Sequence, residues 1–459
     1  MATVDFSRLA TEADLLALAP AEPADYLHQA VLGAGRGAEW PARAFPVSIQ
    51  RIGIVGAGAM GAGIALCFLD AGIPVVLLDC TKPALEKGLV CIRAAYDAAR
   101  RKGRLMAPDI AERMALLRPT LAWKDLADCD WVIEAVNEEL TLKQKVMATL
   151  GKTCRPRTVI ASNTSSIDLD ILARASGRPQ DVVGMHFMVP AQVRPLVEVV
   201  RGAMTSERSL FIAREVVQLI RHIPVQSRVG YGFTGNSMLE GMLRETDFLL
   251  MEGISPQRVD GVLEEFGFAM GPCRMMDLVG LDVCHQVLTE RNRALRPVDH
   301  PAYRLPTRRL HALGRMGQKT GCGYYRYQGR RALPDDEVGR LATGLGDRHG
   351  IVRRRGISDA EILRRCLFPL VNEGLRLIDE GRVQRPSDID LIWVYGYGFP
   401  QGTGGPMYWA SRLGIDAVES GMRAFARRFG DPYGYWTPAT RQRPQFGVSH
   451  RTRGHTSLQ

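Results

Sequence analysis

The amino-acid sequence predicts a doubly wound α/β domain with a parallel sheet, followed by two similar all-α domains. Three observations support this prediction. A glycine-rich turn joins an apolar strand to a helix, strand-like and helix-like segments alternate up to about residue 228, and the second half contains an internal repeat. A chain of 459 residues is long enough for two to four domains of ordinary size.

The glycine-rich turn lies in the segment RIGIVGAGAMGAGIALCFLDAGIPVVLLD, whose pattern indicates a strand, a turn, a helix and a second strand. Gly56 allows a tight turn, Gly58 lets the backbone approach a pyrophosphate, and Gly61 lets the helix pack closely on the strand. Ala59 and Met60 begin the helix, where backbone amides face bound phosphates. All these features together are specific for a Rossmann-like dinucleotide site, whereas a glycine pattern alone also fits a structural turn.

An acidic residue ends the second predicted strand. Residues 74–78 are apolar, and Asp79 follows them. A carboxylate at this place accepts hydrogen bonds from a ribose diol and would repel a 2′-phosphate, so NAD is favoured over NADP. Lys82 lies nearby in the sequence and keeps NADP open as an alternative.

A further strand is expected at residues 130–136 (DWVIEAV), which lead into Glu138. The helix after it would carry Lys143 and Lys145 on one face. Functional loops of a parallel α/β sheet lie beyond the carboxyl ends of its strands. Glu138 falls at such an end, which makes it a candidate for the site.

A cluster of polar residues follows the next predicted strand, at residues 159–161. It has the sequence Ser-Asn-Thr-Ser-Ser and includes Asn163 and Ser165. Its position after a strand favours a functional loop. The other interpretation is helix capping by Ser165 or Ser166, and the two roles do not exclude each other.

A single histidine, His186, stands between apolar residues in GMHF, where a hydrophobic side chain would pack better. Oxidation of an alcohol by hydride transfer needs a base that takes the hydroxyl proton, and histidine suits this task near neutral pH. Glu198 follows in the apolar run RPLVEVV, where a carboxylate is costly unless it is paired. An imidazole N–H is a sensible partner for it. The alternative is a core histidine with a structural role.

Six segments between about residues 50 and 330 carry a more specific signal. They are VGAGAMGAGIA, DWVIEAVNEEL, SNTSSIDLDILA, GMHFMVPAQVRPLVEVV, GFTGNSMLEGM and GRMGQKTGCGYY. In this order and at this spacing they resemble the 3-hydroxyacyl-CoA dehydrogenase family. The resemblance implies NAD-dependent, reversible oxidation of an (S)-3-hydroxyacyl-CoA, such as a 3-hydroxybutyryl-CoA, to the 3-oxoacyl-CoA, with no metal.

The resemblance also implies roles for individual residues. His186 would be the base and Glu198 its orienting partner, while Ser165 and Asn236 would hold the substrate. The positions where the family's cofactor pocket contacts NAD are Glu138, Lys143 and Asn163.

The sequence departs from the family pattern at three places. Val189 stands where the family usually has Asn or Ser, Arg194-Pro195 precedes the LVE run, and Ser237 replaces the usual Arg after Asn236. None of these removes a catalytic residue. Val189 and Arg194 would reshape the acyl pocket, unless Arg194 is simply a solvated surface side chain.

The second half repeats itself at an offset that drifts from 128 to 134 residues. The paired positions are Glu252-Gly253 with Glu380-Gly381, Pro256 with Pro386, Val259-Asp260 with Ile389-Asp390, Gly267-Phe268 with Gly398-Phe399, and Gly271-Pro272 with Gly405-Pro406. Each unit has the pattern of two helices followed by glycine-rich breakers. The counterpart of Asn236 is Arg364, so we expect the second unit to be structural.

The family resemblance explains the repeat. Short family members pair two chains through one helical domain, like the C-terminal domain of 6-phosphogluconate dehydrogenase, whereas multifunctional fatty-acid-oxidation proteins carry two copies. The chain is similar to the dehydrogenase half of such a protein, and residues 1–48 are too few for an enoyl-CoA hydratase half. The expected division is an N-terminal extension (1–48), NAD-binding domain (49–228), first helical domain (229–330), connector (331–354), second helical domain (355–436) and basic tail (437–459).

Composition bears on which partners and which cellular compartment we expect. The net charge is +10, yet only 8 of the 59 cationic residues are lysine and no basic stripe carries interleaved aromatics, so nucleic acid is not expected. The nine cysteines form no CxxC pair, as in a cytoplasmic protein with reduced thiols. The uncharged run 52–69 fits a nucleotide turn and 391–411 a loop, so no membrane span is expected.

The sequence leaves several alternatives open. They are a monomer or a dimer, a separate hydratase chain or acyl-carrier protein as partner, and a biosynthetic enzyme acting on an unusual or carrier-bound thioester. A non-catalytic NAD-binding scaffold is the remaining alternative.

Overall fold

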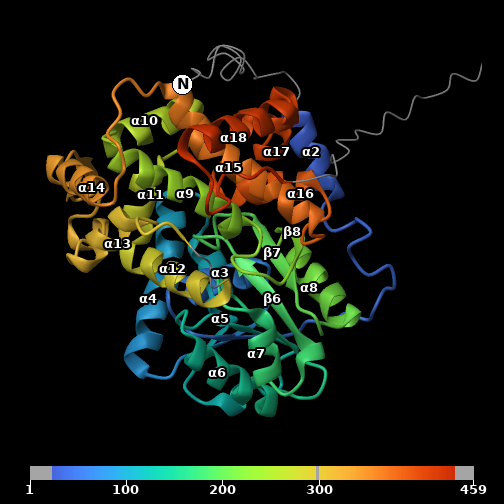
Figure 1. Ribbon diagram of the computed structural model, residues 1–459. Helices are drawn as coiled ribbons and strands as arrows, with labels where there is room; N and C mark the ends of the chain where they lie inside the picture. Colours follow the sequence, from blue (N-terminus) through green and yellow to red (C-terminus); the bar gives the residue numbers. More distant parts are fainter. Residues whose placement is uncertain (1–22, 296–298, 440–459) are drawn as a thin grey trace, which may run out of the picture.

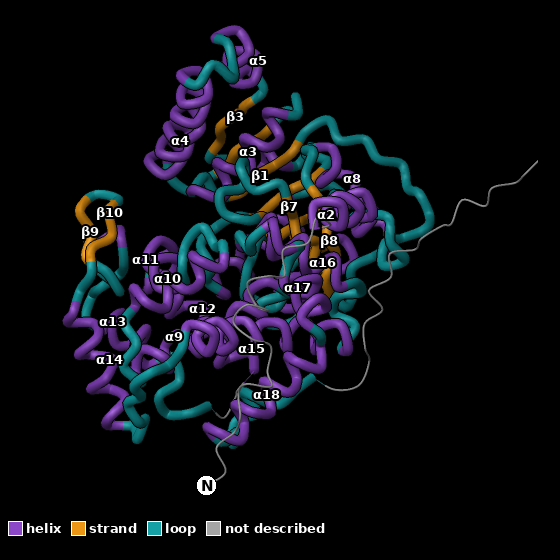
Figure 2. Tube along the Cα trace, turned by 90° about the horizontal axis from the view of Figure 1, so that it is seen from above, coloured by secondary structure: helices purple, strands orange, loops and turns teal. Residues whose placement is uncertain are grey.

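The computed structural model describes residues 23–295 and 299–439. A nucleotide-binding domain built on one large sheet occupies one half of the molecule, and two helical units occupy the other (Figure 1). Figure 2 views the molecule from above and shows the strands of the sheet, with helices beside them, in the upper part and most of the helical units in the lower part. The expected fold class is confirmed, because a mostly parallel sheet is followed by a helical region.

The large sheet has the strand order β3-β2-β1-β4-β5-β6-β7-β8. This order reverses between β1 and β4, which is the point where doubly wound sheets bind ligands. The strands are β1 (Ile52–Val55), β2 (Val75–Leu78), β3 (Leu117–Thr120), β4 (Trp131–Glu134), β5 (Val159–Ser162), β6 (Val182–Phe187), β7 (Leu196–Arg201) and β8 (Ile223–Arg228).

One strand breaks the expected all-parallel pattern. Strand β7 runs antiparallel to β6, and β8 then pairs parallel to β7. The segment between β6 and β7 is too short to hold a crossover helix, so the chain can only turn back on itself. The correction matters for the site because it places residues of β6 and β7 opposite one another.

Both faces of the sheet are covered. Val75 and Leu77 belong to one apolar core, while Val76 and Leu78 belong to the other, as the alternation of side chains along a buried strand requires. The helices of this domain are α3 (Ala59–Asp70), α4 (Lys82–Arg101), α5 (Ala107–Ala115), α6 (Leu140–Thr153), α7 (Leu169–Ala175) and α8 (Glu207–Leu219). Asp168 caps α7, so the N-cap interpretation for Ser165 or Ser166 was wrong by two or three residues.

The helical half confirms the internal repeat. Its first unit contains α9 (Gly235–Met251), α10 (Pro256–Phe266), α11 (Pro272–Val279), α12 (Leu281–Leu295) and α13 (Leu305–Ala312). The second contains α15 (Asp359–Asp379), α16 (Pro386–Leu391), α17 (Pro406–Leu413) and α18 (Ile415–Phe429). The equivalent long helices α9 and α15 pack on each other, and a Cβ on Gly241 would lie only 2.9 Å from Pro369.

In each helical unit, an aspartate at an equivalent position accepts hydrogen bonds from the first amides of a following helix. Asp260 accepts hydrogen bonds from the first amides of α11, at Cys273 and Arg274, and from the hydroxyl of Tyr325. Asp390 does the same at the start of α17, where its hydroxyl donor is Tyr26 at 2.6 Å. The tyrosine hydroxyl that binds the aspartate therefore comes from Tyr325, just after the first unit, in one case and from the N-terminal segment in the other.

Tyr26 belongs to α2 (Pro23–Gly33), which lies against α16 in Figure 1. The N-terminal extension is therefore partly a packed helix and not only a linker. The expected connector also contains regular structure, namely β10 (Arg331–Leu333), which pairs with β9 (Arg326–Gln328), and α14 (Asp336–Arg348), which packs on α9. The basic tail lies outside the described residues from 440 onward.

The expected loop at 391–411 is mostly helical. The π-helical segment η5 (Ile392–Tyr397) continues α16, and α17 begins at Pro406. Three of the five glycines that suggested a loop flank these short helices, and among them Gly398 and Gly404 adopt positive φ angles of 78° and 79°. The segment η5 thus packs against α16 and α9 on the helical side and against β7 of the sheet.

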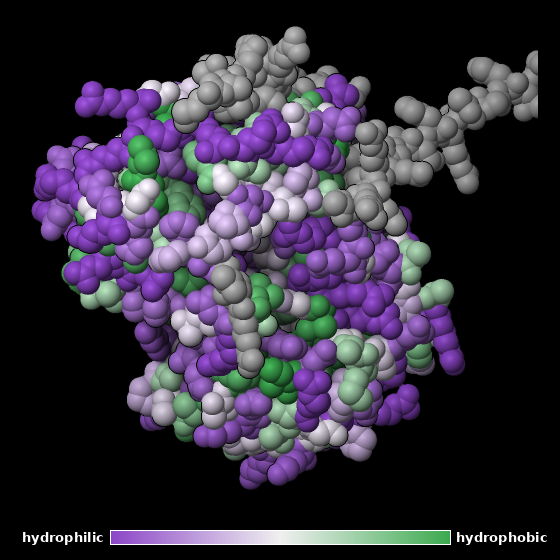
Figure 3. All heavy atoms as spheres, viewed as in Figure 1, coloured by the Kyte–Doolittle hydropathy of each residue, from purple (hydrophilic) through white to green (hydrophobic). Residues whose placement is uncertain are grey.

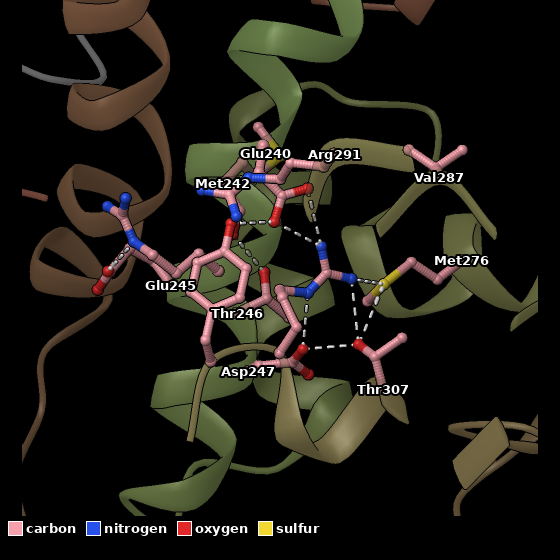
Figure 4. A network of polar contacts seen from close by, with 12 residues as sticks. Glu240, Met242, Glu245, Thr246, Asp247, Met276, Val287, Arg291 and Thr307 are labelled. Atoms are coloured by element: carbon pink, nitrogen blue, oxygen red, sulfur yellow. Dashed lines mark hydrogen bonds and ion pairs between the residues drawn. The ribbon is translucent and has the colours of Figure 1, made fainter. Parts of the chain in front are cut away.

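A buried ionic network fixes the first helical unit (Figure 4). Arg304 donates to Asp247 at 2.8 Å and to Glu240 at 3.3 Å, and Thr307 donates to Asp247 at 2.6 Å. The Arg304 and Asp247 side chains are 3% and 0% exposed, so the charges neutralise each other away from water.

The surface is hydrophilic over most of the face in Figure 3, with apolar residues gathered around a hollow near the middle of that face. Helix α12 lies along the boundary between the two halves in Figure 1 and exposes Val283 and Leu295. Among residues 23–295 and 299–439, no helix combines the length and the apolar character needed to cross a membrane.

Candidate active site

The candidate residues gather at one edge of the sheet. The glycine-rich turn follows β1, Glu138 follows β4, the polar cluster follows β5, and His186 is the penultimate residue of β6. These four strands run parallel, so their carboxyl ends meet at the same edge. The sequence placed Glu138 and the polar cluster at strand ends, and the structure adds the end of β6 with His186 to the same edge.

The glycine-rich turn has the geometry expected of a dinucleotide cradle. Gly56 has a φ of +102°, and a Cβ there would lie 2.7 Å from the carbonyl oxygen of Ala135. A Cβ on Gly61 would overlap the carbonyl of Gly56, so the helix reaches the strand only because residue 61 has no side chain. Around Gly58 there is nothing within 4 Å of an added Cβ. The protein itself does not need this glycine, and the open space fits a pyrophosphate.

Asp79 lies beside this turn at the end of β2. Its Oδ2 accepts the amide of Ala57 at 2.7 Å, and its Oδ1 accepts the amide of Cys80 at 2.7 Å. These bonds fix the carboxylate next to the turn, where an acceptor for a ribose diol is required. The open space at Gly58 therefore fits the pyrophosphate of NAD, and the Asp79 carboxylate fits its ribose.

Glu138 organises the polar cluster. One of its oxygens, Oε1, accepts the hydroxyl of Thr164 at 2.6 Å and the amides of Ser165 and Ser166 at 2.8 and 2.9 Å. Burial alone would raise the pKa of Glu138, but the nearby Lys143 charge and these hydrogen bonds outweigh it and lower the pKa. Glu138 therefore stays ionised and shapes the loop.

Lys143 lies beneath that loop. Its side chain is 1% exposed, and its ammonium donates to Glu134 at 2.7 Å and to the carbonyl of Val136 at 3.1 Å. It also lies 3.4 Å from Glu138. In this arrangement Lys143 acts on the site through two carboxylates, and its charge is turned away from solvent. The expectation that Lys143 and Lys145 share one helix face was wrong, because Lys145 is exposed.

Asn163 connects the cluster to the strand that carries the histidine. Its side-chain oxygen accepts the amide of Phe187 at 2.9 Å, directly after His186. The end of β5 is thereby held against the end of β6. The side-chain nitrogen of Asn163 is left for other contacts.

His186 and Glu198 form the pair that the sequence suggested. His186 Nδ1 lies 3.2 Å from Glu198 Oε2, and the other carboxylate oxygen accepts the amide of Thr234 at 2.8 Å. Both residues are buried, with 8% and 0% of their surface exposed. The pair leaves the second imidazole nitrogen, Nε2, as the atom that can exchange a proton with a ligand.

Glu198 stays ionised despite its burial. Desolvation by itself would raise the pKa of the carboxyl, but the hydrogen bond and charge interaction with His186, together with the amide of Thr234, lower it overall. An ionised carboxylate at this distance holds the imidazole with its Nδ1 proton toward Glu198 and stabilises an imidazolium.

Asn236 joins Ser165 at the start of α9. Its Nδ2 donates to the carbonyl oxygen of Ser165 at 3.1 Å. The segment that carries it also contacts the His186 pair, because Thr234 bonds Glu198 and the ring of Phe233 lies 5.8 Å from the ring of His186. One short segment therefore links the cluster after β5 with the histidine on β6.

Sequence reasoning missed two members of the site. Thr234 contributes only a backbone amide, for which no sequence signal exists. Tyr397 of η5 donates its hydroxyl to Asn236 Oδ1 at 2.8 Å from the repeat that was expected to be structural. The signal for Tyr397 was the glycine-rich stretch around it, which was interpreted as a loop.

The departures from the family pattern lie around this site. Val189 is 71% exposed, and Ser237 donates to Glu373 at 2.8 Å. The guanidinium of Arg194, which is half-buried, lies beside Gly398 at the end of η5.

A dinucleotide cradle and an oriented imidazole at one sheet edge define an NAD-dependent dehydrogenase fold. The family described as "3-hydroxyacyl-CoA dehydrogenase, NAD binding domain" matches residues 51–229, and "3-hydroxyacyl-CoA dehydrogenase, C-terminal domain" matches residues 232–327 and again 362–456. The chain therefore belongs to the 3-hydroxyacyl-CoA dehydrogenase family of NAD-dependent oxidoreductases. The double match of the C-terminal domain agrees with the internal repeat.

Individual relatives support the same assignment. The "Peroxisomal bifunctional enzyme" of Danio rerio is 40% identical over 395 residues, which are 83% of this chain and 54% of the relative. The chain thus spans about half the length of the curated relatives it matches. The dehydrogenase part of multifunctional enzyme 1 from C. elegans shares 27% identity with a TM-score of 0.62, covering 94% of this chain and 98% of that chain.

A third comparison concerns the fold alone. The 3-hydroxybutyryl-CoA dehydrogenase from Escherichia coli has a TM-score of 0.75 at 24% identity, covering 86% of this chain and 97% of that chain. The arrangement of one sheet domain and two helical units therefore recurs in a protein of quite different sequence.

Proposed function

We propose that this protein catalyses the reversible, NAD-dependent oxidation of (S)-3-hydroxyacyl-CoA thioesters to 3-oxoacyl-CoA, with His186 as the general base. The observation that carries the proposal is the His186–Glu198 pair, at 3.2 Å, on the same sheet edge as the glycine-rich turn. A base and a dinucleotide cradle at one edge are what alcohol oxidation by hydride transfer requires. Family membership points to the 3-hydroxyacyl thioester as the alcohol.

The proton steps follow from the pair. Glu198 accepts the Nδ1 proton of His186, so Nε2 carries the lone pair that takes the substrate's hydroxyl proton. The imidazolium formed in this way is stabilised by the buried, ionised Glu198. In the reverse direction His186 returns the proton to the 3-oxo oxygen.

NAD, when bound, accepts the hydride that leaves C3 of the substrate. The space above Gly58 would receive its pyrophosphate, and Asp79 would accept hydrogen bonds from its ribose. Glu138 would hold the loop at 163–166 in place beside it. Lys143 supports this arrangement from below through its contact with Glu138.

The substrate oxygen would be held by neutral donors. Ser165 offers a half-buried hydroxyl, which donates to Glu138 at 3.4 Å and would turn from it toward the substrate. Asn236 offers the N–H of Nδ2 that does not bond the Ser165 carbonyl. Donors aimed at the oxygen stabilise the charge that develops on it as the 3-oxo group is reduced.

The test is a series of acyl thioesters followed by NADH absorbance. We expect oxidation of (S)-3-hydroxybutyryl-CoA, the reduced form of acetoacetyl-CoA, and the kcat/KM values along the series identify the preferred acyl length. The same acyl group on an acyl-carrier protein separates acyl-CoA metabolism from a biosynthetic role, since a preference for the carrier would favour the latter. Absence of NADH change with every thioester would favour a non-catalytic scaffold.

Assembly and location belong to the same proposal. The second helical unit packs on the first within one chain, which favours a monomer, and sedimentation checks it. We place the protein in the cytoplasm on the basis of its cysteine usage, while curated relatives are named for peroxisomes and glyoxysomes. Fractionation of the source cells distinguishes these compartments.

A further inference from the structure

Tyr397 reaches the proposed site from the second helical unit. Its hydroxyl donates to Oδ1 of Asn236 at 2.8 Å, and Nδ2 of Asn236 donates to the carbonyl of Ser165 at 3.1 Å. We propose that Tyr397 is a positioning residue, which holds the Asn236 carboxamide so that its second N–H faces the substrate oxygen. This inference rests on the proposed dehydrogenase function and deepens it.

The two hydrogen bonds determine which way the amide points. A carbonyl such as that of Ser165 only accepts, so the nitrogen end of Asn236 must face it. The Tyr397 hydroxyl then donates to the oxygen end. A flipped carboxamide would place its oxygen against the Ser165 carbonyl and lose that bond. Ser165 and Tyr397 therefore hold the group from both ends.

The hydroxyl of Tyr397 also affects the strength of the remaining donor. A hydrogen bond donated to an amide oxygen draws electron density from the nitrogen and makes its N–H groups better donors. Burial raises the pKa of Tyr397 well above its usual value, and the charge of Glu198 and the nearby Tyr231 add to the rise. The hydroxyl therefore stays protonated and continues to donate throughout the working pH range.

The local backbone is shaped to let Tyr397 approach. The π-helical segment η5 ends at this residue, and single π turns of this kind often occur at functional sites. The Tyr397 ring packs on Trp393 with 4.9 Å between ring centres. On the other side a Cβ on Gly235 would collide with the Tyr397 ring and hydroxyl, so only glycine fits at the start of α9.

The repeat shows that the two units have divided these roles. Gly267 and Gly398 are equivalent, so the counterpart of Tyr397 in the first unit is Phe266, which has no hydroxyl. The counterpart of Asn236 in the second unit is Arg364. The amide is present only in the first unit and the hydroxyl only in the second. The second unit therefore completes the site instead of serving only as packing.

The test compares Tyr397→Phe with Tyr395→Phe in the full chain. Tyr395 belongs to the same π-helical segment and is a matched control. We expect Tyr397→Phe to lower kcat about tenfold, the size of effect that one lost hydrogen bond produces. The KM for NAD should not change, and the midpoint of thermal unfolding should fall by no more than a few degrees, because one hydrogen bond is lost while the ring packing is kept. Tyr395→Phe should behave like the wild type. Equal kcat values for Tyr397→Phe and the wild type would overturn the proposal.

A double-mutant cycle tests whether Tyr397 acts through Asn236. In the Asn236→Ala background the Tyr397→Phe change should cost less than about twofold in kcat, because the group that Tyr397 positions is gone. A second tenfold loss in that background would show an independent role and would contradict the inference.

A crystal structure of Tyr397→Phe gives a readout that does not depend on turnover. If the wild type itself fails to oxidise any 3-hydroxyacyl thioester, the proposed function is wrong, and this structure still decides the positioning role. A rotated Asn236 carboxamide, with its bond to the Ser165 carbonyl lost, supports the role. An unchanged Asn236 carboxamide overturns it.

Discussion

His186 and Glu198 are directly opposed residues of the antiparallel pair β6–β7, and Nδ1 of the first lies 3.2 Å from Oε2 of the second. Side chains of opposed residues point to the same face of a sheet and approach each other closely. A slip of one residue in this register would send the two side chains to opposite faces. The strand register, and not a flexible loop, therefore sets the geometry of the base and its partner.

Because Glu198 is ionised, we expect the difference in unfolding free energy between the wild type and Glu198→Gln to depend on pH. The pKa of Glu198 is lowered from its usual value of 4.5, so ionised Glu198 stabilises the native state above pH 4.5. This stabilisation is lost as the pH falls through the lowered native pKa. We therefore expect the variant to be less stable than the wild type near neutrality and the gap to shrink in acid. Unfolding free energies from urea titrations at several pH values measure it, and a gap that widens in acid would contradict the assignment.

Lys143 predicts a large loss of stability on removal. In Lys143→Met the carboxylate of Glu134, which is 0% exposed, loses its buried ammonium partner. Breaking such a pair costs about 3–5 kcal/mol. Lys145→Met on the exposed face of the same helix is the control and should change the unfolding free energy by less than about 0.5 kcal/mol. Equal effects of the two substitutions in urea unfolding would refute the buried role of Lys143.

The open space at Gly58 predicts a separation between folding and cofactor binding. Gly58→Ala should leave the thermal midpoint unchanged, because its methyl group meets no protein atom within 4 Å. It should weaken NADH binding by about tenfold or more, since the methyl occupies the pyrophosphate position. Gly261→Ala, which also points into open space but lies within α10, should leave the NADH affinity unchanged. It should not lower the thermal midpoint, because alanine is favoured over glycine inside a helix by about 0.5–1 kcal/mol. Titration of NADH fluorescence measures the affinity, and wild-type affinity in Gly58→Ala would place the cofactor elsewhere.

The two capping carboxylates predict different pH windows of stability. Burial raises the pKa of Asp390 to about 8 and that of Asp260 to about 6, from a usual value of 3.8. A raised carboxyl pKa means that the native state binds the proton more tightly, so stability falls as the pH rises from 3.8 to the native pKa. In the wild type, Asp390 should lower the free energy of unfolding up to about pH 8, and Asp390→Asn should abolish this decline. The decline due to Asp260 should end near pH 6, and Asp260→Asn should abolish it. Thermal midpoints over pH 4–9 test this, and identical windows would contradict the account.

Most of the site could be predicted because its signals are local. The GxGxxG spacing of Gly56, Gly58 and Gly61 indicates a nucleotide-binding turn. His186 and Glu198 are polar residues within apolar segments, where a polar side chain needs a partner. What the sequence did not contain was the direction of β7. Register and direction follow from how the whole sheet packs, so the face-to-face position of the pair came only from the structure.

The contacts between distant segments were the other part beyond prediction. Tyr26 and Asp390 are 364 residues apart, and Tyr397 and Asn236 are 161 apart. Nothing in the local pattern of either residue indicates its partner. The glycines around Tyr397 suggested a loop because the helices in this stretch are too short to show a clear period.

The measurement that tests the account most directly is the turnover of His186→Gln beside its affinity for NADH. Glutamine keeps a polar side chain of similar length but cannot take a proton. We predict a kcat for (S)-3-hydroxybutyryl-CoA that is about 10²–10⁴-fold lower, with a Kd for NADH within about twofold of the wild type. A kcat equal to that of the wild type would show that His186 is not the base.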